Sequence, residues 1–293
     1  MNMQHLSKRG IQDYGLFALS ERRSNGRTWA LLTSEEVSEA LGITWQQTAR
    51  LFSRLLLQKR VQQVRRGLYL IPGRLPIGKI WQLSSYEVLW AYMDKLKANW
   101  QITGISAFNH YGFSTQVAQR MTVLNDKLSG DIELAGCYYI FIKLPCEKLG
   151  NKISLPMAGN IEIYFSSKAK ALFDAVYFSS RFGTIPEVYR WIRSVVEFEK
   201  DMSTINELIQ CCMLYGNKKT IARIGFVLEK LEIKNDSLTE KFTKEKASSL
   251  VSLVPYPKGV EGERKGIIHP NWGIIENQNL LDIFSSMEVP DED

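Results

Sequence analysis

The chain of 293 residues is 45% hydrophobic and 23% charged, and it carries a formal net charge of +6. This length and composition allow two folded domains with a substantial core and exclude an intrinsically disordered chain. Residues 1–75 contain twelve Lys or Arg and five Asp or Glu, so the excess positive charge belongs to the N-terminal part of the chain.

No apolar run approaches the roughly 18 residues of a bilayer-spanning helix, and the N-terminal sequence MNMQHLSKRG lacks the apolar core of a signal peptide. We therefore expect a cytoplasmic protein that does not bind a membrane. The four cysteines, at positions 137, 146, 211 and 212, lack paired C-x-x-C spacing. They are interpreted as structural thiols in a reducing compartment.

The first predicted elements are a helix and a short strand. Residues 11–23 place apolar side chains at helical spacing, and residues 28–32 have the composition of a strand. Capping signals then predict two closely spaced helices. Thr33 with Glu36 is a capping box for a helix that ends at Gly42, and Thr44 with Gln47 is a second capping box.

The helix that follows Thr44 has two chemically different faces. At about 100° per residue, its apolar face is formed by Thr48, Leu51, Phe52, Leu55 and Leu56. Its polar face is formed by Gln46, Gln47, Arg50, Ser53 and Arg54. Trp45 lies at the edge of the apolar face and is expected in the core.

Gln and Arg side chains can pair with adenine and guanine edges in the major groove of DNA. A recognition helix contacts bases mainly with its N-terminal turns. We therefore predict base contacts from Gln46, Gln47 and Arg50, although Gln47 also has a capping role. Thr44, at the start of the helix, is also counted among the predicted DNA-binding residues. The residues better placed for phosphates are Arg54, Lys59 and Arg60.

A β-hairpin is predicted after this helix. Residues 61–65 and 68–71 are rich in β-branched or aromatic side chains, and Arg66-Gly67 forms the turn between them. Arg65 and Arg66 at its tip would meet the DNA backbone or the minor groove. This order of elements predicts a winged helix-turn-helix domain over residues 1–78.

The alternative is an ordinary helical hairpin with a solvated basic face. The charge distribution argues against it, because no Asp or Glu occurs between Glu39 and Glu87 while eight Lys or Arg do. A merely soluble surface would normally mix the two signs. We therefore expect double-stranded DNA as a partner.

Residues 79–293 are predicted to form a larger α+β domain. Ser84 with Glu87 caps a helix, and residues 102–111 have the pattern of a short helix. Strand composition at 118–125, 131–135, 138–144 and 161–165 predicts a small, mostly antiparallel sheet of about four strands. A helix capped by Ser166 or Ser167 follows, with further helices at 185–199, 202–215 and 218–232 and a strand at 249–254.

No catalytic or metal site is apparent in the sequence. Ser166-Ser167 upstream of Asp174 loosely matches nucleotidyltransferases, but Asp174 lacks the second carboxylate that would hold a metal under a triphosphate. The three histidines are scattered, and no phosphate-binding or dinucleotide-binding glycine motif occurs. We expect no cofactor and no enzymatic activity, and we interpret the second domain as a partner or effector module.

Several segments, in this order, resemble the AbiEi antitoxins of type IV, abortive-infection toxin-antitoxin systems. They are VRRGLYLIP at 64–72, ISAFNHYGF at 105–113, IEIYFSSKAKALFDAVYF at 161–178, ARIGFVLEKL at 222–231 and NWGIIEN at 271–277. Residues 1–27 are longer than the family pattern, and residues 234–265 match it poorly.

The resemblance implies a bifunctional protein. Its N-terminal domain would repress its own operon by binding inverted repeats in the promoter, and its C-terminal domain would neutralise a separately encoded nucleotidyltransferase toxin, with no stable complex assumed. Two other hypotheses remain open. One is a stand-alone transcription factor whose second domain senses a ligand or partner, and the other is a nucleic-acid enzyme that uses Asp174.

Overall fold

The computed structural model describes residues 8–74, 80–234, 236–244, 250–256 and 265–285. The protein has a mixed α+β fold, as the sequence predicts. It divides into two compact units, the first made of residues 1–100, 123–143 and 154–164 and the second of 101–122, 144–153 and 165–293. The predicted domain boundary at residues 78 and 79 lies outside the described residues.

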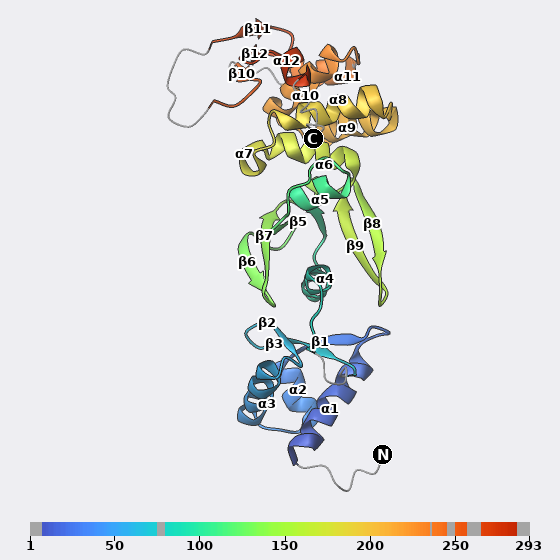
Figure 1. The fold of residues 1–293 in the computed structure, drawn as a ribbon, viewed down its shortest axis with the longest axis vertical. Helices are drawn as coiled ribbons and strands as arrows, with labels where there is room; N and C mark the ends of the chain where they lie inside the picture. Colours follow the sequence, from blue (N-terminus) through green and yellow to red (C-terminus); the bar gives the residue numbers. More distant parts are fainter. Residues whose placement is uncertain (1–7, 75–79, 235, 245–249, 257–264, 286–293) are drawn as a thin grey trace, which may run out of the picture. The chain divides into compact units, whose positions relative to one another are not determined.

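The N-terminal part of the first unit contains four helices and a three-stranded sheet. Their bounds are α1 Lys8–Arg23, β1 Trp29–Thr33, α2 Ser34–Leu41, α3 Trp45–Leu57, β2 Gln62–Arg65, β3 Leu68–Pro72 and α4 Ser85–Lys95. The strands pair antiparallel in the order β1-β3-β2. Helices α1, α2 and α3 lie on one side of this sheet and α4 on the other (Figure 1).

Successive side chains of each strand point to opposite faces of the sheet, and buried side chains on both faces pack against helices. Ala30 and Leu32 of β1 belong to a buried cluster with the apolar side chains of α1, α2 and α3. In the same cluster, the ring of Tyr69 stacks on Phe52 of α3 with centroids 3.7 Å apart. Trp29 has the opposite parity in β1 and meets Trp90 of α4 edge to face. The sheet is therefore the central layer of this region.

The predicted capping signals are confirmed. In both predicted capping boxes, at Thr33 before α2 and at Thr44 before α3, the threonine side chain accepts from the third backbone N–H while the Glu36 or Gln47 side chain accepts from the cap backbone. Gly42 ends α2, so only a short turn separates the two helices. These local contacts fix the starts of both helices and therefore the residues that each face presents.

The structure does not confirm the expectation that Trp45 belongs to the core. Trp45 is 71% exposed, whereas Trp29 in β1 is 2% exposed. Trp45 is the first residue of α3, and the neighbouring elements leave its ring uncovered. Helical periodicity placed it at the edge of the apolar face, and periodicity alone does not show whether anything packs against an edge position.

The next strands in the chain, β4 to β9, form a larger sheet than the sequence indicated. Its strands are β4 Trp100–Thr103, β5 Met121–Asn125, β6 Gly130–Leu134, β7 Cys137–Lys143, β8 Lys152–Met157 and β9 Ile161–Ser166, in the order β6-β7-β5-β4-β9-β8. The prediction of about four, mostly antiparallel strands missed β4 and β8. It also missed that β4 and β9 pair parallel. The predicted helix at 102–111 is shorter, because Gly104 with φ of +66° separates β4 from α5 Ile105–His110.

The second unit is mainly helical. Its further elements are a 3-10 turn at Cys146–Lys148, α6 Lys168–Tyr177, α7 Ser179–Phe182, α8 Glu187–Arg193 with π-helical Ser194–Phe198, α9 Met202–Tyr215, α10 Lys218–Lys230, α11 Asp236–Lys244, β10 Val251–Ser252, β11 Ile267–His269, β12 Ile274–Glu276 and α12 Leu280–Ser285. Strands β10, β12 and β11 form a separate small sheet. Helix α6 contacts α8, α9 and α10 (Figure 1). The helices predicted from residues 166, 185, 202 and 218 are confirmed, with Ser167 as the cap of α6.

One glycine in α10 is required by a close approach. A Cβ on Gly225 would lie 2.3 Å from the ring of Trp272, which is 4% exposed and donates through Nε1 to Glu229 at 2.7 Å. Any larger side chain would displace this indole. The ARIG and NWG segments of the sequence are therefore linked by one packing contact.

A fully buried polar network lies in the second unit. Asp174 of α6 is 0% exposed and accepts hydrogen bonds from Lys170, from Thr103 at 2.7 Å and from Ser166 at 3.1 Å. Lys170 is 2% exposed and lies over the ring of Tyr215. A buried ammonium and a buried carboxylate are tolerable only as a hydrogen-bonded pair, so each side chain depends on the other.

The two tryptophans give a first prediction. We expect Trp29→Ala to lower the free energy of unfolding by about 3–5 kcal/mol, because it leaves a cavity in the core. Trp45→Ala should change this free energy by no more than about 0.5 kcal/mol, because the ring is exposed. Urea unfolding of both variants measures the difference. A large loss of stability in Trp45→Ala would place that side chain in the core after all.

The buried network gives a second prediction. We expect Asp174→Ala to cost about 3–5 kcal/mol of stability, because Lys170 is left as an uncompensated buried charge. The double variant Lys170→Met with Asp174→Asn should cost less, because it removes both charges and keeps an acceptor for Thr103 and Ser166. Denaturant unfolding measures both. If the double variant were the less stable one, the pairing of the two charges would not be what holds this network together.

Candidate nucleic-acid interface

The two predicted faces of α3 are confirmed by burial. Thr48, Leu51, Phe52 and Leu55 are buried. The opposite face leaves its polar side chains in solvent, namely Gln46, Gln47, Arg50 and Ser53. The helix therefore presents a row of amide and guanidinium groups, which are the side-chain groups that can pair with base edges.

Gln47 has two roles in this arrangement. Its Oε1 accepts from the backbone N–H of Thr44 at 2.9 Å, and its own backbone N–H donates to Oγ1 of Thr44 at 3.3 Å. Capping therefore occupies the amide oxygen of Gln47 and leaves the side-chain NH₂ as a donor. The predicted capping role of this residue is confirmed, and its side-chain NH₂ remains as a donor for a base edge.

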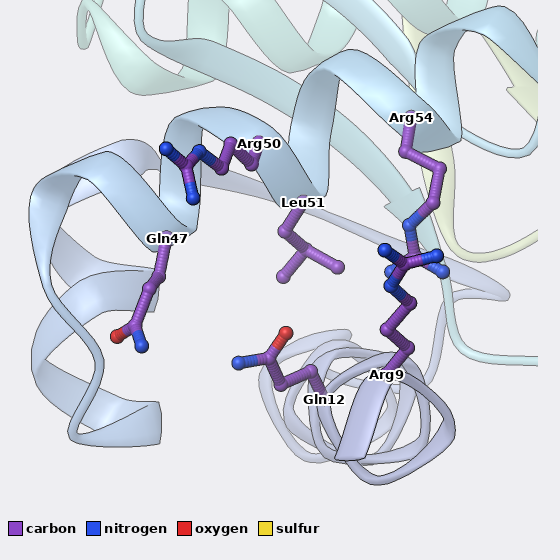
Figure 2. Close-up of a pocket in the computed structure, with 6 residues that line it drawn as sticks. All are labelled: Arg9, Gln12, Gln47, Arg50, Leu51 and Arg54. Carbon is purple, nitrogen blue, oxygen red and sulfur yellow. The ribbon is translucent and has the colours of Figure 1, made fainter. Parts of the chain in front are cut away.

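A cleft of about 470 Å³ lies between α3 and α1, and among the described residues Leu51 is its single apolar lining side chain. Its polar lining comes from both helices, namely Gln47, Arg50 and Arg54 of α3 and Arg9 and Gln12 of α1. In Figure 2, Arg54 and Arg9 extend from their helices toward each other, and Gln12 points from α1 toward the α3 side. The cleft therefore combines three guanidinium groups and two amides.

Arg54 is fixed by an acidic partner. Its two terminal nitrogens donate to both carboxylate oxygens of Asp13 in α1, at 3.0 and 2.5 Å, and the two side chains are 28% and 19% exposed. Bidentate pairing of this kind fixes the guanidinium plane and ties α3 to α1. The predicted phosphate contact of Arg54 therefore has to compete with a carboxylate that already occupies it.

Arg9 and Arg50 differ from Arg54 in this respect. Both side chains are exposed, and neither has an ion pair or a side-chain hydrogen bond with any residue that the structure describes. Their guanidinium groups are therefore available to an anion. Sequence reasoning missed Arg9 and Gln12, although they stand three residues apart and so share one face of α1.

The hairpin after α3 is confirmed, with Arg66-Gly67 as its turn and a φ of +78° at Gly67. Its two arginines behave differently. Arg65 donates to the hydroxyl of Tyr92 in α4 at 2.6 Å, so it is directed toward α4. Arg66 is exposed and has no side-chain partner among the described residues. Of the two predicted contacts at the tip, only Arg66 is therefore unoccupied.

Two further predicted phosphate contacts lie where α3 ends. Lys59 and Arg60 are both exposed, and neither side chain has a partner in the described part of the chain. The backbone of this turn is well fixed, since Lys59 donates to Leu56 at 2.9 Å and its carbonyl accepts from Trp81 at 3.1 Å. The two cations are thus held on a rigid turn at the end of the candidate recognition helix.

The second unit offers less to a substrate. Asp174 is fully buried within its network, so the carboxylate considered for catalysis has no access to solvent. Burial raises the pKa of the Cys211 thiol to about 12 and also raises the pKa of Cys212, which makes both poor nucleophiles. In the described ranges, no cluster of three or more His, Cys, Asp or Glu side chains could hold a metal ion.

Within the described ranges, no helix combines the length and the apolar character needed to cross a membrane. No known protein-family model and no curated protein sequence matches the chain. Among solved structures, the chain is similar to the crystal structure of the RV2827C protein from Mycobacterium tuberculosis, with a TM-score of 0.56, 12% sequence identity and 94% coverage of both chains. This likeness shows a shared fold along nearly the whole chain.

Proposed function

We propose that residues 8–74 form a winged helix-turn-helix that binds duplex DNA with α3 in the major groove. The observation that carries this proposal is the exposed polar face of α3, where Gln46, Gln47 and Arg50 lie on one side of a helix whose other side is buried. The order helix, strand, helix, helix and β-hairpin supports it, as does the short turn between α2 and α3.

Charge supports the same surface. The candidate readers and the cations Lys59, Arg60 and Arg66 lie in a stretch without any Asp or Glu, between Glu39 and Glu87. Phosphate contacts by Lys and Arg supply most of the sequence-independent affinity for DNA, and base contacts by α3 would supply the specificity. The region has both kinds of group on exposed positions.

We further propose that the protein is the antitoxin of a type IV toxin-antitoxin system, in which domain 1–78 represses its own operon through inverted repeats. Domain 79–293 would neutralise a nucleotidyltransferase toxin. This part rests on the resemblance of five segments to AbiEi antitoxins, two of which meet in the contact between Gly225 and Trp272. The buried state of Asp174 supports a non-enzymatic role for the second domain.

Binding to the DNA upstream of its own gene tests the first proposal. We expect Arg50→Ala or Gln46→Ala to cost about 1–3 kcal/mol and to relax sequence preference at one base pair. Lys59→Ala should weaken binding to all sequences similarly and lower the salt slope by about one. Titrations of wild-type and mutated operator duplexes at several salt concentrations measure these effects.

Two results of those titrations would count against the proposal. The first is a wild-type protein that binds its upstream DNA with no dependence on salt, because phosphate contacts release counterions. The second is an equal effect of Arg50→Ala and Lys59→Ala on every sequence, which would remove the assignment of α3 as the reading helix. Arg65→Ala is a useful comparison, since Tyr92 already holds that side chain and a weaker effect than that of Arg66→Ala is expected.

Co-expression tests the antitoxin proposal. We expect cells that express a neighbouring nucleotidyltransferase gene to stop growing and to recover when the full chain is supplied. Arg50→Ala should keep this rescue while losing repression of the operon, because the two activities reside in different domains. Growth and promoter activity are measured together. If the protein repressed its operon but no nucleotidyltransferase gene lay next to it, or if the full chain did not restore growth, the stand-alone transcription factor would be favoured instead.

A further inference from the structure

The cleft between α1 and α3 has a composition that suits one class of ligand. Its lining contains the guanidinium groups of Arg9, Arg50 and Arg54 and the amides of Gln12 and Gln47, and no acidic side chain of the described residues lines it (Figure 2). Small-molecule pockets of about 300–1,000 Å³ are usually lined mainly by apolar groups. This cleft has a similar volume of about 470 Å³, but Leu51 is the only apolar side chain that lines it in the described part of the chain, so its composition suits a polar anion.

The balance of charge in the cleft is positive even after internal pairing. Asp13 offsets the charge of Arg54, but Arg9 and Arg50 have no acidic partner in the part of the chain that the structure describes. Two uncompensated cations that line one cleft repel each other, and an anion bound in the cleft would attract both and offset that repulsion. The amide nitrogens of Gln47 and Gln12 add neutral donors to the same space.

The geometry also connects the cleft to the candidate reading face. Arg50 and Gln47 belong both to the exposed face of α3 and to the cleft wall. A helix in the major groove of DNA is flanked on both sides by the phosphates of the two DNA strands. An anion site next to the exposed polar face of α3 would therefore lie close to one of these phosphates. Guanidinium forks match the oxygens of a phosphodiester in pairs.

We propose that this cleft binds one backbone phosphate of the DNA duplex, with Arg9 and Gln12 of α1 and Arg50 of α3 as donors. The inference rests on the proposed DNA-binding function and adds α1 to the interface. Arg54 acts as a positioning residue, because its bidentate bond to Asp13 ties α3 to α1 and so sets the width of the cleft. The phosphate would thus fix the register of α3 on the duplex.

Charge removal within α1 tests this inference. The DNA used is the upstream duplex that the wild-type protein binds. We expect Arg9→Ala to weaken binding by about tenfold or more, as for loss of a hydrogen bond to a charged group. It should also lower the slope of log K against log salt by about 0.9. The matched control is Arg23→Ala, which removes the same charge from the exposed C-terminal end of α1 and should leave both quantities unchanged.

A second measurement locates the phosphate itself. In a series of duplexes, each carries one neutral methylphosphonate in place of a single phosphate. We expect one position beside the bases that α3 contacts to weaken wild-type binding, and Arg9→Ala to show no further loss at that position, because the contact is already absent. Equal sensitivity of wild-type protein and Arg9→Ala at every position would overturn the inference.

The outcomes separate this inference from the function on which it rests. If wild-type protein binds no DNA, the proposed function fails and the inference fails with it. If wild-type protein binds DNA and Arg9→Ala binds equally well, only the cleft assignment fails. A free phosphate-containing anion is the other ligand with the same chemistry, and calorimetry with inorganic pyrophosphate tests it. If Arg9→Ala abolished tight binding of pyrophosphate but left the affinity for DNA unchanged, the cleft would be a site for a free anion and the proposal would be overturned. Circular dichroism of each variant confirms that the fold is intact.

Discussion

The burial of one side of α3 is the constraint on which the candidate interface depends. Phe52 stacks on Tyr69 of the sheet, and Leu51 and Leu55 are almost completely removed from water. With these side chains fixed in the core, rotation of the helix about its axis would bury charged groups and expose apolar ones, at a cost of several kcal/mol. The polar face therefore has a single orientation. The capping box at Thr44 fixes which residues occupy the first turn of α3, from which we propose that bases are contacted.

Sequence reasoning succeeded where structure is determined by residues close together in the chain. Capping boxes involve a residue and its third neighbour, and the two faces of α3 follow from helical periodicity, so both were predictable. The strand β4 was harder to predict, because its four residues are followed at once by Gly104 and a short helix. All four residues are buried, so the strand lacks the alternation of buried and exposed positions that distinguishes a half-buried strand from a buried helix. Parallel pairing of β4 with β9 joins residues far apart in sequence and leaves no local signal.

The candidate site was predictable only in part, for the same reason. The exposure of Gln46, Gln47 and Arg50 follows from the pattern of one helix, but the partners of other cations do not. Arg54 finds Asp13 at a separation of 41 residues, and Arg65 finds Tyr92 at a separation of 27. A count of basic residues treats all of them as equivalent. The structure divides them into cations already engaged by the protein and cations open to an external anion.

This division changes which elements are expected to contact DNA. The sequence, with two adjacent arginines in the hairpin, predicts the hairpin as the second contact beside the candidate recognition helix. In the structure, Arg65 is drawn toward α4, which covers the face of the sheet opposite to α1, α2 and α3. Helix α1 instead brings Arg9 and Gln12 into the cleft that Arg50 also lines, at the border between the exposed face of α3 and its buried residue Leu51. A duplex bound to α3 would therefore contact α1 as well as the hairpin, because phosphate oxygens accept hydrogen bonds from cationic side chains that the protein leaves unpaired.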